Sequence, residues 1–372
     1  MKAADSLLQM VRNSDAIRAF ARQVEIEAAS LEKPLRIMEV CGGHTHAILE
    51  YGLDQLLPAN IRLVHGPGCP VCVLPQHRID AAINLGQSAD TILVTLGDMI
   101  RVPGSDGISL QRTRAAGGDV RYVYSPLDAL TVAAEHPDKS VIYFAIGFET
   151  TAPMTALLLE QALSRQLSNL FIHCNHVLVP QAMELILTAG GAVDAFIAPG
   201  HVSVMSGVNQ YRCLTDKYRV PVVIAGFEPV DLLDAIVRII QQVKSATAAV
   251  DNAYSRFVKP SGNRKAQQLV EQYFEPYDDF FWRGIGRIPG SALKVRGLYA
   301  DHDAEAQFPE LCPAPTEEKP SNCLCGSILM GLAQPTDCPL FGSGCSPQNP
   351  QGSCMVSNEG ACAAYYKYRR AS

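Results

Sequence analysis

Short apolar runs, rich in valine and isoleucine, recur along the chain between residues 35 and 229. Each is followed at once by Gly, Pro, His or Cys, and helix-compatible stretches separate most of them. Continuous apolar strands that alternate with helices are typical of buried parallel sheets. The pattern therefore predicts an α/β fold. The runs are LRIMEV, IRLVHG, TILVTLGD, VRYVYSP, VIYFAIGFETT, NLFIHCNH, AFIAPGH and VPVVIAGFEP.

The runs fall into two sets of four, which predicts two similar parallel-sheet α/β domains flanking a cleft. We place α/β domain I at residues 35–138 and α/β domain II at residues 139–250, after N-terminal amphipathic helices within residues 1–34. Residues 251–372 are irregular and end in a cysteine-rich tail with little apolar periodicity. We expect this small C-terminal domain to need a cofactor that holds it together.

The composition narrows the class of protein. The chain has 372 residues and a net charge of −6, which argues against a dedicated nucleic-acid or membrane-surface binder. No run approaches the roughly 18–20 uncharged apolar residues that a membrane span needs. The N-terminus lacks the apolar centre and the cleavage site of a signal peptide. We therefore expect a cytoplasmic location, where clustered thiols usually indicate metal or redox chemistry.

The first chemical motif is Cys41-Gly-Gly-His-Thr-His46, directly after a predicted strand. Glycines let the backbone approach a ligand closely, and a helix beginning behind them would lower the pKa of the Cys41 thiol. Thiolate and imidazole, here from Cys41 and His44, are plausible ligands of Fe(II) or Zn(II). The alternative is an ordinary tight turn with a buried cysteine and surface histidines.

The second motif is Gly66-Pro-Gly-Cys-Pro-Val-Cys72. A Cys-x-x-Cys pair at the end of a strand can cycle between dithiol and disulfide, or bind a metal. A zinc knuckle would need a second Cys-x-x-Cys pair, which the chain does not contain. Redox use of Cys69 and Cys72 is therefore favoured.

Polar residues also end the later strands. His201 is the first choice for a functional role there, ahead of Glu149 and Glu228. In open α/β folds, ligands bind beyond the carboxyl ends of the strands. We therefore expect these side chains to face the Cys41 loop across a cleft, although each alone could belong to an ordinary polar turn.

The tail offers six thiols within 40 residues, more than the four that a [4Fe-4S] cluster needs. One division makes Cys325, Cys338, Cys345 and Cys362 the ligands and leaves Cys323 and Cys354 as a neighbouring pair that can undergo redox chemistry. Exchanging Cys323 for Cys325 is the main alternative, and a structural zinc site of four thiolates is another. Cys213 and Cys312 are isolated and are interpreted as inert, with Cys213 in the core.

Six motifs together resemble the HypD family of hydrogenase maturation proteins, over residues 35–370. The departure we find is Asn358, where the family more often has serine. The motifs are Cys41-Gly-Gly-His-Thr-His, His65-Gly-Pro-Gly-Cys-Pro-Val-Cys72, Gly147-Phe-Glu-Thr-Thr151, Ala198-Pro-Gly-His-Val202, Ala225-Gly-Phe-Glu-Pro229 and Met355-Val-Ser-Asn-Glu-Gly-Ala-Cys362.

The resemblance implies two α/β domains, a C-terminal [4Fe-4S] domain, and two partners: the small chaperone HypC and the cyanide donor HypE. On the HypC complex the Fe(CN)2CO unit of NiFe-hydrogenases is assembled before transfer to the hydrogenase large subunit. Carried over, Cys41 is the iron-binding thiolate, shared with a cysteine of HypC, and His44 is a ligand or proton donor. Cys69 and Cys72 relay electrons, and Glu359 supports the cluster ligand Cys362.

Two other functions compete with this assembly scaffold, which is not a conventional turnover enzyme. A cluster-linked thiol–disulfide reductase acting on a protein substrate would reduce generic disulfides and would not need Cys41. A zinc-stabilised interaction module would be colourless, with zinc in the tail. The sequence contains no Walker A motif, no GxGxxG after the first strand and no Gly-x-Ser-x-Gly elbow, so it gives no support to conventional nucleotide or hydrolase chemistry.

Overall fold

A computed structural model describes residues 13–191, 193–315 and 322–369 of the chain. Its first helix, α2 (Ser14–Ala28), begins at Asn13, whose side chain accepts hydrogen bonds from the backbone N–H groups of Asp15 and Ala16. The buried face of α2 packs against α13 (Pro229–Lys244). This confirms a helix in the N-terminal segment; residues 1–12 lie outside the described residues.

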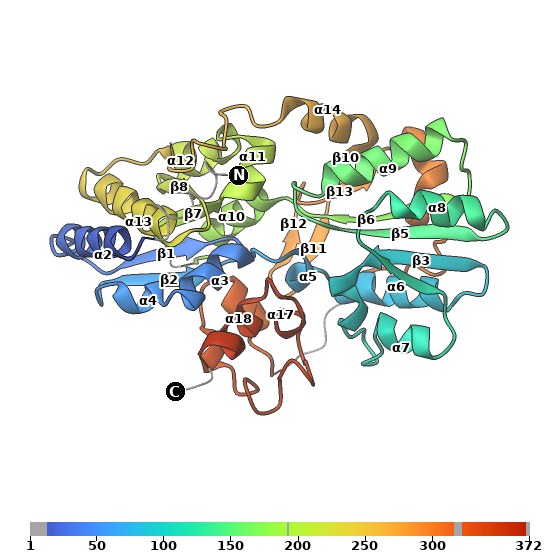
Figure 1. The fold of residues 1–372 in the computed structure, drawn as a ribbon, viewed down its shortest axis with the longest axis horizontal. Helices are drawn as coiled ribbons and strands as arrows, with labels where there is room; N and C mark the ends of the chain where they lie inside the picture. Colours follow the sequence, from blue (N-terminus) through green and yellow to red (C-terminus); the bar gives the residue numbers. More distant parts are fainter. Residues whose placement is uncertain (1–12, 192, 316–321, 370–372) are drawn as a thin grey trace.

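Two parallel sheets form the body of the molecule and lie side by side in Figure 1. The first has the order β2 (Ile61–His65), β1 (Leu35–Glu39), β7 (Ala195–Pro199), β8 (Val222–Ala225) and β9 (Val250–Asn252). The second has the order β4 (Val120–Val123), β3 (Thr91–Leu96), β5 (Ser140–Gly147) and β6 (Leu170–His176). Every pairing in both sheets is parallel. The α/β fold class is therefore confirmed.

The strands are not divided between the sheets in the order that the sequence suggested. The chain leaves the first sheet after β2, builds the whole second sheet, and returns at β7, which pairs with β1. The expected boundary between residues 138 and 139 thus falls inside the second sheet, between β4 and β5. Apolar runs identify buried strands, but they do not say which strands are neighbours.

Helices cover the faces of both sheets (Figure 1) because each βα connection returns the chain across the sheet. The helices around the first sheet include α3 (Gly42–Glu50), α4 (Leu53–Leu56), α10 (Val179–Thr188), α11 (Gly200–Ser206), η2 (Asn209–Tyr211), α12 (Arg212–Tyr218) and α13. Those around the second sheet include α6 (Gln76–Gln87), η1 (Gly97–Arg101), α7 (Leu110–Ala115), α8 (Asp128–Glu135) and α9 (Ala152–Ser164).

The C-terminal region is built from short pieces, as expected from its composition. Two small antiparallel sheets pair β10 (Phe274–Pro276) with β13 (Leu293–Val295) and β11 (Phe280–Trp282) with β12 (Gly286–Ile288). The helices of this region are α14 (Arg264–Tyr273), η3 (Gly297–His302), α15 (Ala304–Gln307), α16 (Cys325–Leu329), η4 (Pro335–Asp337), α17 (Ser353–Val356) and α18 (Ala361–Tyr368).

The tail packs beneath the junction of the two sheets. Helix α18 contacts α3, and α17 contacts α5 (Pro70–Val73), which lies between the sheets in Figure 1. Met355 and Val356 join the same buried core as Val71 and Cys72. The tail therefore lies directly against the two N-terminal cysteine motifs. Within the described ranges, no helix is long and apolar enough to cross a membrane.

Candidate functional site

Cys41 is the residue before the first turn of α3, and its neighbours crowd it closely. The backbone N–H groups of Gly43 and His44 point to its sulfur. A Cβ on Gly42 would lie 2.3 Å from the carbonyl oxygen of Glu359, so only glycine allows the tail to approach here. Gly43 likewise leaves room for the Phe227 ring. The two glycines thus allow the close approach that the sequence predicted. The groups that approach are other parts of this chain, Glu359 and Phe227, and not a ligand.

The expectation of a lowered pKa at Cys41 is wrong for the metal-free chain. Burial raises the pKa of the Cys41 thiol to about 12, and the nearby carboxylates of Glu359 and Glu39 add to the rise. The two N–H groups at the start of α3 act in the opposite direction but are outweighed. Cys41 is therefore a neutral thiol at pH 7 until a cation replaces its proton.

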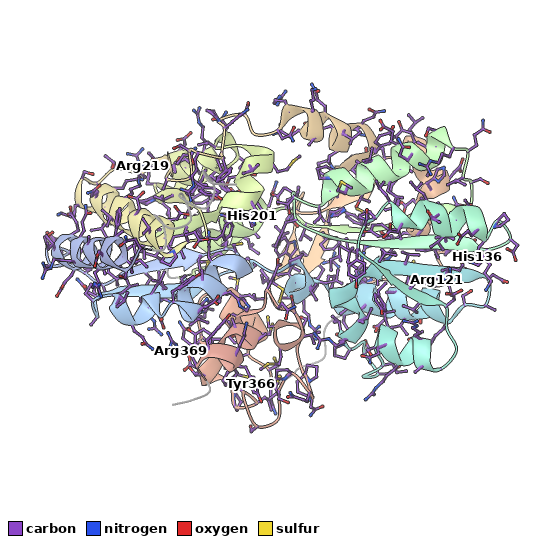
Figure 2. The ribbon with its side chains drawn as sticks, viewed as in Figure 1. Arg121, His136, His201, Arg219, Tyr366 and Arg369 are labelled. Carbon is purple, nitrogen blue, oxygen red and sulfur yellow. A yellow bond between two sulfur atoms is a disulfide. The ribbon has the colours of Figure 1, made fainter. Side chains whose placement is uncertain are left out.

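Two imidazoles approach this turn from different elements. His44 is fully buried, and its ring lies 4.7 Å from the Phe227 ring, which stacks at 4.0 Å on His201. Figure 2 shows His201 near the centre of the molecule, at the start of α11. Neither ring nitrogen of His44 makes a hydrogen bond of ordinary geometry within the described residues. Burial lowers the pKa of His44 to about 4, so the ring is neutral and can act as a ligand or acceptor.

The buried carboxylate of Glu39 holds the Cys41 turn in place through hydrogen bonds. Glu39 accepts hydrogen bonds from the backbone N–H of Cys41 at 3.0 Å, from the Thr45 hydroxyl, and from Nδ1 of His65 at 2.7 Å. His65 Nε2 lies 3.1 Å from the hydroxyl of Tyr365 on α18. The turn is therefore tied to the tail through a continuous polar chain.

The Cys-x-x-Cys motif forms a disulfide between Cys69 and Cys72, both fully buried around α5. Its loop lies directly on the Cys41 turn, because the N–H of Gly42 donates to the carbonyl of Gly68 at 3.0 Å. A Cβ on Gly68 would lie 2.3 Å from the backbone nitrogen of Cys41. The structure thus brings together the two N-terminal cysteine motifs.

The two glutamates of the later strands occupy different settings. Glu149 is buried, accepts a hydrogen bond from the N–H of Val179 at 2.9 Å, and leaves Oε2 without a partner among the described residues. Burial raises the pKa of Glu149 to about 7. Glu228 precedes α13 as its N-terminal cap residue. The role expected for both carboxylates, facing Cys41, stays a prediction.

In the tail, the structure places Cys325 next to Cys354. The sulfur of Cys325 lies 2.7 Å from that of Cys354, closer than two non-bonded sulfur atoms normally pack and only somewhat beyond a disulfide of about 2.05 Å. The contact with Cys325, and then burial, raise the pKa of Cys354 well above its usual value. Cys325 and Cys354 are thus close neighbours, and the choice between Cys323 and Cys325 as a ligand beside Cys338, Cys345 and Cys362 stays a prediction.

The loop between residues 336 and 351 carries two of the remaining thiols. Its only buried residues are Cys338 and Cys345. Burial and the nearby thiol of Cys325 raise the pKa of Cys362 well above its usual value, with smaller contributions from Cys323, Cys345 and Cys338. The backbone N–H of Gln351 donates to the sulfur of Cys345 at 3.3 Å, as N–H groups do around iron–sulfur centres. The Cys338 and Cys345 thiols therefore occupy the buried positions that apolar side chains would otherwise fill in a loop of this length.

The same thiols do not converge on one point. Within the described residues, no group of three or more His, Cys, Asp or Glu side chains is arranged to hold a single metal ion. A cube makes a different demand, because each of its thiolates binds a different iron atom. The donor set is consistent with a [4Fe-4S] cluster in chemical type and number.

The tail also contacts the Cys69–Cys72 disulfide through a hydrogen bond. Ser353, at the start of α17, donates its hydroxyl to the carbonyl of Cys72 at 3.1 Å. Cys354, the next residue, belongs to the thiol pair in the tail. The two cysteine pairs therefore lie on packed neighbouring helices.

Sequence reasoning missed three contributors to this site. Glu39 was hidden in the apolar run LRIMEV, where a lone acid at the end of a buried strand could have signalled a polar anchor. Phe227 separates the two imidazoles, and Tyr365 closes the chain from His65. Neither aromatic carried a signal. Cys213, expected in the core, is exposed.

Comparison with known proteins places this geometry in context. Residues 15–369 match the HypD model, described as the hydrogenase formation hypA family. The chain is 49% identical to the hydrogenase maturation factor HypD of Rhizobium leguminosarum bv. viciae, over 95% of this chain and 94% of that protein. It is 45% identical to the factor of the same name from Escherichia coli strain K12, over 99% and 97% of the two chains.

Proposed function

Because the chain belongs to the HypD family of hydrogenase maturation factors, we propose that it is the scaffold on which the Fe(CN)2CO unit is assembled. The observation that carries this proposal is the contact between the Cys41 turn and the loop of the Cys69–Cys72 disulfide. A metal-binding thiol and a two-electron thiol couple are packed against each other, as a reductive assembly of ligands on iron requires.

The Cys41 turn suits a ferrous ion as its substrate. With a pKa of about 12, the Cys41 thiol binds iron by releasing its proton, so iron binding becomes stronger as pH rises. His44 stays neutral because its pKa is near 4, and can bind iron or accept that proton. A cysteine from a HypC-type chaperone would supply a second thiolate, and soft sulfur donors suit an iron that takes cyanide and CO.

The Cys69–Cys72 couple would supply electrons for cyanide transfer. A thiocyanate carried by a HypE-type donor is cleaved at its S–C bond, which takes two electrons. The Cys69 and Cys72 thiols lose two electrons and two protons and become the disulfide. The donor sulfur regains one proton, cyanide binds the iron, and the other proton is released. The completed unit then passes to the hydrogenase large subunit.

The tail would restore the dithiol. We propose that Cys323, Cys338, Cys345 and Cys362 hold a [4Fe-4S] cluster, which supplies single electrons when bound. The Cys325 and Cys354 thiols would reduce the Cys69–Cys72 disulfide by exchange, and the packing of α17 on α5 supports this step. Both sulfurs of the Cys69–Cys72 disulfide are buried, which disfavours the alternative of a reductase for protein disulfides.

The test is the rate of assembly when the couple is removed. The double variant Cys69→Ser, Cys72→Ser is combined anaerobically with iron and the two partner proteins, and metal-bound cyanide is followed by its infrared bands. We expect the bands to form at least about 100-fold more slowly than in the wild type. Cys213→Ser, which changes an exposed thiol, should leave the rate unchanged. Assembly at the wild-type rate in the double variant would overturn the electron role.

A further inference from the structure

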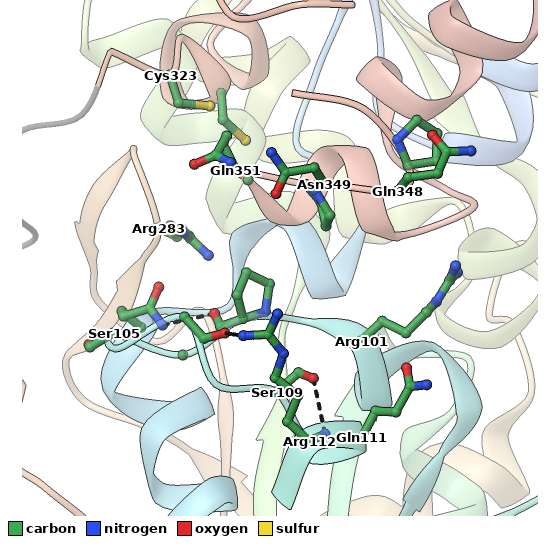
Figure 3. Close-up of a pocket in the computed structure, with 18 of the residues that line it drawn as sticks. Arg101, Ser105, Ser109, Gln111, Arg112, Arg283, Cys323, Gln348, Asn349 and Gln351 are labelled. Carbon is green, nitrogen blue, oxygen red and sulfur yellow. Dashed lines mark hydrogen bonds between the residues drawn. The ribbon is translucent and has the colours of Figure 1, made fainter. Parts of the chain in front are cut away.

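A cavity of about 890 Å³ opens between the second α/β unit and the cysteine-rich tail. In Figure 3, Cys323 and Gln351 lie on one side of it, and Ser105, Ser109 and Arg112 lie on the other. A volume of this size is typical of sites for small molecules. None of the described residues that line the cavity belongs to the Cys41 turn, whereas Cys323 and Cys325 of the proposed relay line it.

The charge of this cavity is opposite to that of the chain. Three arginines line it (Arg101, Arg112 and Arg283), and none of its described lining residues is an aspartate or glutamate. The whole chain, in contrast, has a net charge of −6. Such a concentration of positive charge in a concave site focuses attraction on anions.

The arginines are available to a ligand. The buried Nη1 of Arg283 has no hydrogen-bond partner among the described residues. Arg112 donates from its guanidinium to the carbonyl of Gly107 at 3.2 Å, and Arg101 makes a long contact of 3.4 Å to the carbonyl of Val356. Within the described ranges, none of the three pairs with a carboxylate. An unpartnered buried guanidinium nitrogen is costly, and an anion would relieve that cost.

The wall of the cavity also presents one member of the tail thiol pair. Cys325 lines the cavity, whereas its neighbour Cys354 does not and is 1% exposed. Of this pair, Cys325 is therefore the member that a small molecule in the cavity can reach; Cys323 lines the same cavity. The Cys69–Cys72 disulfide is not among the lining residues.

We propose that this cavity binds a small anionic thiol, which reduces a Cys325–Cys354 disulfide from the side of Cys325. The thiolate attacks the sulfur of Cys325, forms a mixed disulfide, and releases Cys354 as a thiolate. A second thiolate attacks the sulfur of the first thiol, forms the disulfide of the small molecule, and releases Cys325. Two small thiolates thus provide two electrons, and the two cysteines take up protons from water.

The inference rests on the proposed redox role of the Cys325 and Cys354 pair, and it adds where reducing equivalents enter. The anionic groups of the thiol would bind Arg283 and its two neighbouring arginines. The concave shape and the volume favour a small molecule over the broad face of an acidic electron-carrier protein.

The experiment compares three thiols of one shape and different charge. The cluster-containing full chain, oxidised anaerobically, is treated with 2-mercaptoethanesulfonate, 2-mercaptoethanol or cysteamine at equal thiolate concentration. Differential alkylation and mass spectrometry follow the release of Cys325 and Cys354. We expect the anionic thiol to react at least about tenfold faster than the cationic one at low salt, with the difference shrinking as salt increases. The net charge of the chain alone would produce the opposite order.

Two variants locate the effect. Arg283→Gln should remove most of the preference for the anionic thiol, whereas Arg264→Gln, which changes an exposed arginine elsewhere, should preserve it. In Cys354→Ser, the symmetric disulfide of 2-mercaptoethanesulfonate should exchange with the Cys325 thiolate, leaving a stable mixed disulfide on Cys325 and releasing one small thiolate. Equal rates for all three thiols, or a preference that survives Arg283→Gln, would overturn the cavity proposal and leave the proposed assembly role intact. A pair that never forms a disulfide would overturn both this inference and the tail's proposed part in the relay.

Discussion

The Cys41 turn and the loop at residues 336–351 both present thiols, but they are held in opposite ways. The Cys41 turn is fixed by the protein alone, through the three hydrogen bonds to Glu39 and the close contacts at Gly42 and Gly68. The loop has no buried residue other than Cys338 and Cys345. Under the proposed function, the site that receives iron is preorganised, while the loop proposed to hold a cluster depends on that cofactor for its folding.

The largest expected effect comes from removing the cofactor's ligands. In Cys338→Ser, Cys345→Ser, backbone amides of residues 336–351 should exchange with solvent on the order of 100-fold faster, because the loop has no other core. Amides of the two parallel sheets should keep their wild-type rates. Hydrogen exchange with mass spectrometry measures both regions, and an anaerobic iron chelator on the wild type is the second route. Unchanged protection of the loop would show that the cofactor does not organise it.

A second prediction concerns Glu149, whose pKa is raised by burial from 4.5 to about 7. Because the folded pKa lies above the unfolded one, the stabilisation is present below pH 4.5 and is lost as pH rises through about 7. The wild type should therefore lose up to about 3 kcal/mol relative to Glu149→Gln over this range. Urea unfolding at pH 5 and pH 8 gives the difference. Parallel pH dependence in the two proteins would mean that Glu149 does not titrate as expected.

A third prediction concerns Glu39, the carboxylate that holds the Cys41 turn in place. Glu39→Gln removes a charged acceptor and places an NH2 group opposite hydrogen-bond donors. We expect a loss of about 2 kcal/mol in the free energy of unfolding and weaker iron binding at Cys41. Glu50→Gln, at the exposed end of the same helix, is the matched control and should change stability by less than about 0.5 kcal/mol. Equal effects of the two substitutions would show that Glu39 does not hold the Cys41 turn in place.

The smallest effect on the free energy of unfolding is expected at Tyr365, which links the Glu39–His65 pair to the tail. Tyr365→Phe loses the hydroxyl that lies between His65 and Gln334. Denaturant unfolding should show a loss of about 1 kcal/mol. Tyr124→Phe, at a highly exposed ring, should show none. A null result for Tyr365 would mean that packing alone joins α18 to the turn.

The sequence was informative where chemistry and local pattern coincide. The apolar runs located the parallel strands, and the motifs at their ends placed Cys41, His44 and the Cys69–Cys72 pair correctly at strand–helix junctions. The sharing of strands between sheets could not be predicted, because the partner of β1 lies more than 150 residues away at β7. Non-local pairing leaves no trace in local periodicity.

The arrangement of the tail thiols could not be predicted for a related reason. Cys323 and Cys325 differ by two positions in an irregular segment, so spacing cannot decide which of them is a cluster ligand. The contact between Cys325 and Cys354 joins α16 to α17, and local sequence pattern does not reveal it. The pKa of Cys41 was misjudged because the start of a helix is visible in sequence, whereas the burial that outweighs it is not.

The central claim is that Cys41 holds the iron under assembly while separate thiols in the tail hold a cluster. The most direct measurement is the Mössbauer spectrum of the 57Fe-labelled complex with the HypC-type partner, isolated without oxygen, for the wild type and for Cys41→Ser. We predict a low-spin ferrous signal beside a [4Fe-4S] signal in the wild type, and the cluster signal alone in Cys41→Ser. A ferrous signal that persists in Cys41→Ser, or a wild type without any cluster signal, would contradict the account.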